Sequence, residues 1–166
     1  MPDQMTTRDD ALQRASRIKL MIFDVDGVLT DGALYFNHEG EEFKVFNSLD
    51  GHGMRMLRES GVRLAIITGR KAPCVEWRMK NLRIDLLLQG VDNKLAALKG
   101  LLEELGLTPE EAGFMGDDVI DLQVMDHCGF SAAPVNAHPL AKQYARLVTE
   151  RTGGFGAARE VCEFIL

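Results

Sequence analysis

The fold is decided by the stretch Ile18–Gly27, which reads IKLMIFDVDG. A nearly continuous apolar run stops there at two aspartates and a glycine. Runs without polar–apolar alternation are typical of strands that are buried on both faces of a parallel sheet. The stretch therefore predicts a central strand. Ligands of open parallel sheets bind outside the carboxyl ends of the strands, so we expect Asp24 and Asp26 to lie at a binding edge.

Three more apolar runs of the same form follow along the chain, at 62–67, 85–88 and 112–115. Helical patterns separate the four runs, at about 51–60, 73–82 and 93–105. The third pattern is the clearest, because its leucines recur at helical spacing and Gly106 closes it. The alternation predicts an α/β fold, a doubly wound parallel sheet. A last helix is expected after the glycine-rich segment Thr152–Gly156.

An inserted hairpin, at about 32–47, interrupts this alternation. Its two strands are expected at 33–36 and 42–46, around a loop that contains Gly40. Their side chains would expose a set of large apolar groups: Leu34, Phe36, Phe43 and Phe46. Exposed aromatic strands tend to associate. An interface between subunits is therefore favoured over packing within the same domain.

The bulk composition limits the partners. The length of 166 residues suits a single domain, predicted at 18–166, after an N-terminal extension at 1–17. The net charge of −6 argues against nucleic acid and anionic membranes as partners. No apolar run reaches the length of a membrane span, the N-terminus has no signal-like segment, and the three cysteines are widely separated. A cytoplasmic protein is expected.

A second acidic group strengthens the interpretation of the first. Gly116-Asp117-Asp118 follows the fourth apolar run, and Asp121 comes one turn later. Each acidic group by itself could be a solvated turn or a helix cap. Two groups at the ends of parallel strands should instead converge, and converging carboxylates repel unless a cation lies between them. Oxygen ligands without a nearby cysteine or histidine pair favour Mg²⁺.

Thr68 and Lys94 complete a candidate phosphate site. Thr68 ends the second apolar run, where its hydroxyl could bond a phosphoryl oxygen, and Lys94 begins the leucine-patterned helix. Alone, Thr68 would be a helix cap and Lys94 a surface lysine. In this order, however, they supply local positive charge and a hydrogen bond for an anionic substrate in an acidic protein.

The order Asp-x-Asp-Gly, Thr-Gly, Lys, Gly-Asp-Asp-x-x-x-Asp resembles the haloacid dehalogenase superfamily of phosphohydrolases. The resemblance implies that Asp24 attacks phosphorus and forms an aspartyl-phosphate, while Asp26 acts as general acid and base. It also implies that Mg²⁺ is bound by Asp24, the main-chain carbonyl of Asp26 and Asp117. Asp118 and Asp121 would orient waters or Lys94. The spacing between the motifs leaves no room for a cap domain.

In stretches that include Asp24–Gly32, Ile67–Ala72 and Met115–Asp121, the chain also resembles capless phosphatases of 3-deoxy-D-manno-octulosonate 8-phosphate, an intermediate of lipopolysaccharide biosynthesis. That resemblance implies a homotetramer built through the hairpin, with the C-terminal tail reaching a neighbour's active site. The substrate-binding candidates are Thr30, Gly69 and Arg70, and we expect the Arg70 guanidinium to contact the substrate's carboxylate. Leu49 and Phe155 stand where the subfamily often has arginine. A phosphatase of nonulosonate 9-phosphates is therefore the alternative.

Three other functions are less favoured for this chain: a signalling domain, a scaffold without activity and a phosphotransferase. A phosphorylation-controlled receiver domain shares the sheet, the acidic pocket, a threonine and a lysine. In receivers, however, the acid pair follows the first strand and the phosphoacceptor aspartate ends a middle strand. Here the second strand ends in Thr68-Gly69, and the double aspartate at 117–118 comes last. A silent scaffold has no support, because every catalytic position is filled. Transfer of phosphate to a sugar would require that water be excluded from an open site.

Overall fold

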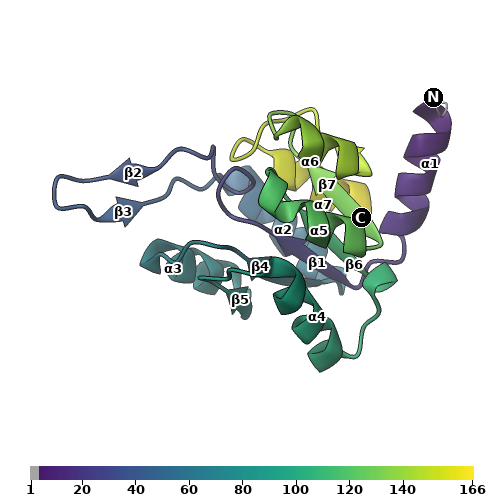
Figure 1. Cartoon of the computed structure of the whole chain (residues 1–166), viewed down its shortest axis with the longest axis horizontal. Coiled ribbons are helices and arrows are strands. Elements are labelled where there is room, and N and C mark those ends of the chain that lie inside the picture. Colours follow the sequence, from purple (N-terminus) through teal and green to yellow (C-terminus); the bar gives the residue numbers. More distant parts are fainter. Residues whose placement is uncertain (1–3) are drawn as a thin grey trace.

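A computed structural model describes residues 4–166, with side chains described from Thr7 onward. Within that range the chain has the predicted α/β architecture, a parallel sheet with strand order β5-β4-β1-β6-β7-β8 (Figure 1). The strands are β1 Leu20–Phe23, β4 Arg63–Ile67, β5 Leu86–Leu88, β6 Ala112–Met115, β7 Phe130–Ala133 and β8 Leu147–Val148. The sequence predicts the first four of these strands but neither β7 nor β8.

Helices cover both faces of the sheet, as the unalternating strands require. Met21 and Phe23 of β1 face one core, whereas Leu20 and Ile22 face the other. The first core contains side chains of α1 Gln4–Ala15, α2 Ser48–Glu59, α3 Pro73–Leu82 and α7 Ala157–Ile165. The second contains side chains of α4 Lys94–Leu105, α5 Leu122–His127 and α6 Pro139–Tyr144. Short 3₁₀ turns precede β6 at Pro109–Glu111 and follow it at Val119–Asp121.

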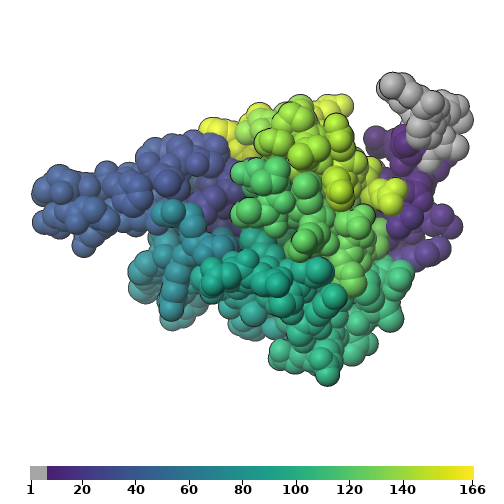
Figure 2. Space-filling view, viewed as in Figure 1, coloured from purple at the N-terminus to yellow at the C-terminus, as the bar shows by residue number. Residues whose placement is uncertain are grey.

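The hairpin is present and projects from the body of the molecule (Figures 1 and 2). Its regular strands, β2 Tyr35–Phe36 and β3 Glu42–Phe43, are shorter than the sequence predicts. Among residues 4–166 these two strands pair only with each other. No adjacent strand therefore extends their hydrogen bonding. Leu34, Phe36 and Phe43 are about half exposed, at 48%, 53% and 50%. The surface of these three side chains is therefore open in the single chain, whereas Phe46, which was also expected to be exposed, packs against the core of its own domain.

The glycine-rich segment packs against its own chain. The Gly154 amide donates to the Val28 carbonyl, and a Cβ on Gly153 would lie 1.9 Å from the Gly27 carbonyl oxygen. From there the chain enters α7, whose amides at Gly156 and Arg159 donate to the buried Asp50 carboxylate of α2. The segment thus supports the loop after β1 within its own subunit, although Phe155 is exposed.

None of the helices in residues 4–166 combines the length and apolar character needed to cross a membrane. The longest helices have 12 residues, and α2 and α4 each place one side against the sheet.

Candidate active site

The candidate site lies where the order of the strands reverses. β1 pairs with β4 on one side and with β6 on the other, so the chain segments that follow these three strands start side by side. Asp24, Thr68 and Asp117 come from these segments. They border a pocket of about 240 Å³ that is lined by Asp24, Asp26, Gly32, Thr68, Gly69, Arg70, Lys94, Asp117, Asp118 and Ile120. The structure thus brings most of the predicted site residues together.

Size alone does not locate this site. A larger cleft of about 390 Å³ lies between α2 and α3 and is lined by none of these carboxylates. The converging titratable side chains, not the volume, single out the smaller pocket.

Lys94 is the buried cation of the pocket. Its side chain is only 4% exposed, and its Nζ lies 2.9 Å from Asp24 Oδ2 and 2.7 Å from Asp121 Oδ1. Lys94 is the first residue of α4, where the helix dipole disfavours a positive charge. Burial also lowers the lysine pKa, but the Asp24 and Asp121 carboxylates outweigh both effects and hold the pKa above its usual value. Lys94 is therefore an ammonium fixed beside Asp24.

Asp24 offers a carboxylate that is held at both oxygens. Its Oδ1 accepts a hydrogen bond of 2.7 Å from the Val25 amide, while Oδ2 faces Lys94. Burial and the nearby Asp121 carboxylate raise the pKa of Asp24, and Lys94 opposes that rise. The pKa of Asp24 stays raised in spite of Lys94, so this lysine alone does not offset the cost of burying the Asp24 carboxylate.

Two glycines let the acidic residues approach one another. A Cβ on Gly27 would lie 1.9 Å from Asp117 Oδ2, and Gly27 has a φ of +81°. A Cβ on Gly116 would lie 2.5 Å from the Cβ of Asp121. A side chain at Gly27 would force Asp117 away from the loop after β1, and one at Gly116 would displace Asp121. Both glycines are therefore required by the shape of the site.

The acidic cluster fits a divalent cation. Carboxylate oxygens of Asp24, Asp117 and Asp121 lie within 4.8 Å of one another. Burial, followed by repulsion from Asp24, raises the pKa of Asp117 to about 7. A hard cation would relieve that repulsion, and a set of oxygen donors suits Mg²⁺.

Asp121 is less suited than Asp24 and Asp117 to bind the metal, because it does not line the pocket and its two oxygens already contact three donors. Oδ1 faces Lys94, and Oδ2 accepts hydrogen bonds from the amides of Asp117 and Asp118 at 3.0 and 3.3 Å. Asp121 is fully buried and thereby fixes both Lys94 and the loop that carries Asp117. Asp118 is exposed and caps the turn that follows, through a hydrogen bond from the Val119 amide.

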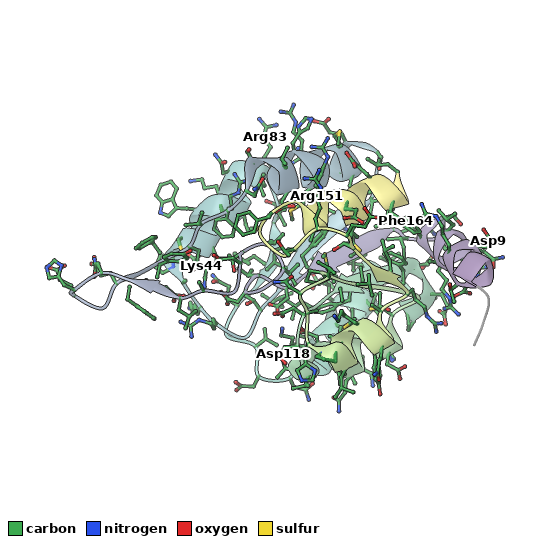
Figure 3. The ribbon with its side chains drawn as sticks, turned by 90° about the horizontal axis from the view of Figure 1, so that it is seen from above. Asp9, Lys44, Arg83, Asp118, Arg151 and Phe164 are labelled. Atoms are coloured by element: carbon green, nitrogen blue, oxygen red, sulfur yellow. The ribbon has the colours of Figure 1, made fainter. Side chains whose placement is uncertain are left out.

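Asp26 lies at the mouth of the pocket, near the predicted Arg70 and beside Lys44 and Glu42, which the sequence did not indicate. Its Oδ1 is 2.6 Å from Lys44 Nζ, and its Oδ2 is 4.0 Å from Arg70 Nε. Glu42 links the two cations, at 2.8 Å to Lys44 and 3.0 Å to Arg70. Figure 3 shows Lys44 where the hairpin joins the body. The alternation of charged and apolar residues at 42–45 was the available signal.

Two substrate-binding candidates have contacts that the sequence did not predict. The Thr30 side chain is buried inside the loop after β1, where its hydroxyl accepts hydrogen bonds from the amides of Gly27 and Gly32. Thr30 is therefore placed to hold this loop and does not line the pocket. Arg70 does line the pocket, but part of its guanidinium is paired with Glu42.

Comparisons with known proteins agree with this architecture. Residues 77–159 match the model of the haloacid dehalogenase-like hydrolase family. The chain is 49% identical, over 95% of its length, to the 3-deoxy-D-manno-octulosonate 8-phosphate phosphatase KdsC of Escherichia coli K12, and it covers 84% of that relative.

Two solved structures of proteins with this description are also similar. The phosphatase from Yersinia pestis superposes with a TM-score of 0.93 at 49% identity, covering 95% of this chain and 85% of that one. The phosphatase from Moraxella catarrhalis, solved with magnesium, phosphate and KDO, has a TM-score of 0.93 at 43% identity, covering 95% and 91%.

Proposed function

This chain belongs to the haloacid dehalogenase-like hydrolases, and from that premise we propose that it is a magnesium-dependent phosphatase of 3-deoxy-D-manno-octulosonate 8-phosphate. The observation that carries the chemistry is the convergence of Asp24, Asp117 and the buried Lys94 at the ends of adjacent strands. The observation that carries the substrate is the 49% identity to the relative over 95% of the chain.

Asp24 acts as the nucleophile. Its carboxylate attacks phosphorus, and the resulting aspartyl-phosphate divides hydrolysis into two easier steps. The Val25 amide and Lys94 fix the orientation of the carboxylate. Lys94 also offsets charge on the phosphoryl oxygens, and the Thr68 hydroxyl donates a hydrogen bond to one of them. Lys94 is itself held by Asp121, so the positive charge stays in place throughout the reaction.

Asp26 transfers the proton. It protonates the leaving oxygen as the phosphate ester breaks and then takes a proton from the water that attacks the aspartyl-phosphate. Asp24, Asp117 and the main-chain carbonyl of Asp26 would hold Mg²⁺, with Asp118 orienting bound water. When bound, the ion supplies neutralisation of the negative charge shared by Asp24 and the phosphate.

The sugar acid is recognised at the open mouth of the pocket. Arg70 is partly exposed there, beside Gly69, and a guanidinium binds a carboxylate in a fork. Binding of the sugar carboxylate would compete with Glu42 for Arg70. Leu49 and Phe155 add no positive charge, so a nonulosonate 9-phosphate is the alternative substrate.

The assembly proposed with this function is a cytoplasmic homotetramer that acts in lipopolysaccharide biosynthesis. The exposed apolar side chains of the 32–47 hairpin support an interface between subunits. A C-terminal tail that covers a neighbour's active site has less support, because Gly153 and Gly154 are buried in their own chain. Phe155 is the exposed residue of this segment that would be available to a neighbour.

The test is phosphate release from a panel of sugar phosphates, with Mg²⁺ and with excess chelator. We expect the octulosonate 8-phosphate to give the highest kcat/KM, and chelation to abolish turnover. Asp24→Asn should lower turnover by at least about 10³-fold, because an amide cannot replace the attacking carboxylate. Full activity in chelator or in Asp24→Asn would refute the mechanism. Preference for a nonulosonate 9-phosphate would refute only the substrate.

A further inference from the structure

The strand β3 and the residues after it have two chemically different sides. Lys44 and Glu42 form ion pairs with the pocket residues Asp26 and Arg70, whereas Phe43 and Val45 are exposed, at 50% and 55%. Successive residues of extended chain point to opposite sides, so one short segment can serve two surfaces. The apolar side belongs to the proposed subunit interface. The charged side belongs to the mouth of the active site.

Lys44 is buried to an unusual degree for a residue of a projecting hairpin. Its side chain is 2% exposed, and its Nζ lies 2.6 Å from Asp26 Oδ1 and 2.8 Å from Glu42 Oε1. Removing an ammonium from water is costly unless hydrogen bonds and opposite charges replace the water. The two carboxylates supply this replacement. Lys44 is therefore held in one position by Asp26 and Glu42.

Arg70 closes the cluster into a ring. Glu42 Oε2 lies 3.0 Å from Arg70 Nη2, and Arg70 Nε lies 4.0 Å from the second oxygen of Asp26. The ring alternates acidic and basic groups, so each side chain restrains its neighbours. Asp26 follows Asp24 by two residues. Both aspartates line the same pocket, so the ring meets the pocket at the carboxyl group that is proposed to protonate the leaving oxygen.

We infer that Lys44, anchored by Glu42, is a positioning residue that holds the carboxyl group of Asp26 toward the leaving oxygen. This inference rests on the proposed function. As the P–O ester bond breaks, its electron pair stays on the leaving oxygen, which takes the proton of Asp26. The new Asp26 carboxylate faces the Lys44 ammonium, which keeps its own protons. Attacking water later returns a proton to Asp26, while the bond between phosphorus and Asp24 breaks.

The experiment is a leaving-group series measured on Lys44→Met. The substrates are p-nitrophenyl, phenyl and benzyl phosphate, which present similar rings but increasingly basic leaving oxygens. The kcat/KM for benzyl phosphate should fall about 10- to 100-fold, because this leaving group needs the proton. The value for p-nitrophenyl phosphate should change less than about 3-fold. A role in packing or in binding the ring would lower all three values equally.

Matched variants separate the possible outcomes. Lys99→Met, on the exposed side of α4, should leave the series unchanged, and Lys44→Arg should restore part of the benzyl phosphate activity. Glu42→Gln, which loosens Lys44 from the other side, should give a weaker dependence on the leaving group and serves if Lys44→Met fails to fold. Asp26→Asn tests the premise. If the loss of kcat/KM depends on the leaving group in Asp26→Asn but not in Lys44→Met or Glu42→Gln, only this inference fails. If Asp26→Asn shows no such dependence, the proposed acid is wrong.

Discussion

The two lysines that pair with aspartates of the pocket come from contrasting parts of the molecule. Lys94 begins a helix that packs on the central sheet, and its partners Asp24 and Asp121 follow β1 and β6. Lys44 comes from a hairpin that projects from the body, and its partners are Asp26 and Glu42. We call the first set, with Asp117, the inner half of the pocket. The second set, with Arg70, is the outer half.

The difference suggests a division of labour. The inner half is fixed by sheet register and helix packing, which suits chemistry that every phosphate ester shares. The outer half takes Glu42 and Lys44 from a two-stranded element whose stability is marginal without further packing. In the proposed reaction it would face the part of the substrate that varies. Substitutions in the inner half should thus affect all substrates, and those in the outer half should depend on the leaving group or the sugar.

Among the changes that compare the two halves, the largest effect is expected for Lys94→Met. The kcat/KM should fall about 10²- to 10³-fold for every leaving group, because a fixed charge beside the phosphoryl group is lost. Stability at pH 8 should drop by about 3 kcal/mol, since Asp24 and Asp121 lose their buried partner. Urea unfolding measures the change in stability and the leaving-group series measures the change in kcat/KM, with Lys99→Met as control. A loss confined to poor leaving groups would erase the distinction between the two halves.

A backbone substitution tests how tightly the inner half is built. Gly27→Ala would place a methyl group against Asp117 in a backbone conformation that disfavours alanine. We expect Mg²⁺ affinity to weaken about 10- to 100-fold, as measured by titrating activity with the ion. Gly40→Ala is a matched control, because its φ is +80° but nothing lies within 4 Å of the added atom. Equal affinities in the two variants would show that Asp117 is not constrained by the loop.

The sequence predicted the inner half better than the outer half. Long apolar runs and flanking glycines or prolines indicated β1, β4 and β6, and α3 begins at Pro73 and ends at Leu82 as expected. Residues that follow adjacent parallel strands must converge, so Asp24, Thr68 and Asp117 could be placed together from the pattern alone. The small residues of β7, with sequence FSAA, and the two-residue β8 gave no comparable signal.

The contacts of the outer half depend on how the hairpin lies against the body of the molecule, which the sequence pattern does not specify. The approach of Lys44 to Asp26 joins residues 18 apart, through a hairpin whose direction no periodicity encodes. Likewise, a count of acidic residues cannot reveal that both oxygens of Asp121 are engaged. The predicted roles of Arg70 and Thr30 came from resemblance, and the ion pair of Arg70 with Glu42 and the burial of Thr30 were not predictable from it.

Mg²⁺ should stabilise the inner half in a pH-dependent manner. The raised pKa of Asp117, about 7 against an ordinary 3.8, means that the folded metal-free protein keeps a proton which the unfolded chain releases. Stability of the metal-free protein should therefore fall as pH rises through this window. Saturating Mg²⁺ should raise Tm by about 5–10 °C at pH 8 and by clearly less at pH 5.5, where protons compete. Asp117→Asn should abolish the difference, whereas equal gains at both pH values would contradict the assignment.

The smallest effect on the folded chain is expected at the apolar side of the hairpin. Phe43→Ser should dissociate the assembly but change the stability of the subunit by no more than about 0.5 kcal/mol, because the ring is already half exposed in the single chain. Trp77→Ser, at a 73% exposed aromatic residue on α3, is the control for losing a surface ring. Light scattering measures the assembly, and the leaving-group series measures the proton transfer by Asp26. If the hairpin needs its neighbours to hold Lys44 in place, dissociation should lower kcat/KM most for benzyl phosphate. An unchanged series in a dissociated protein would mean that the outer half is complete within one subunit.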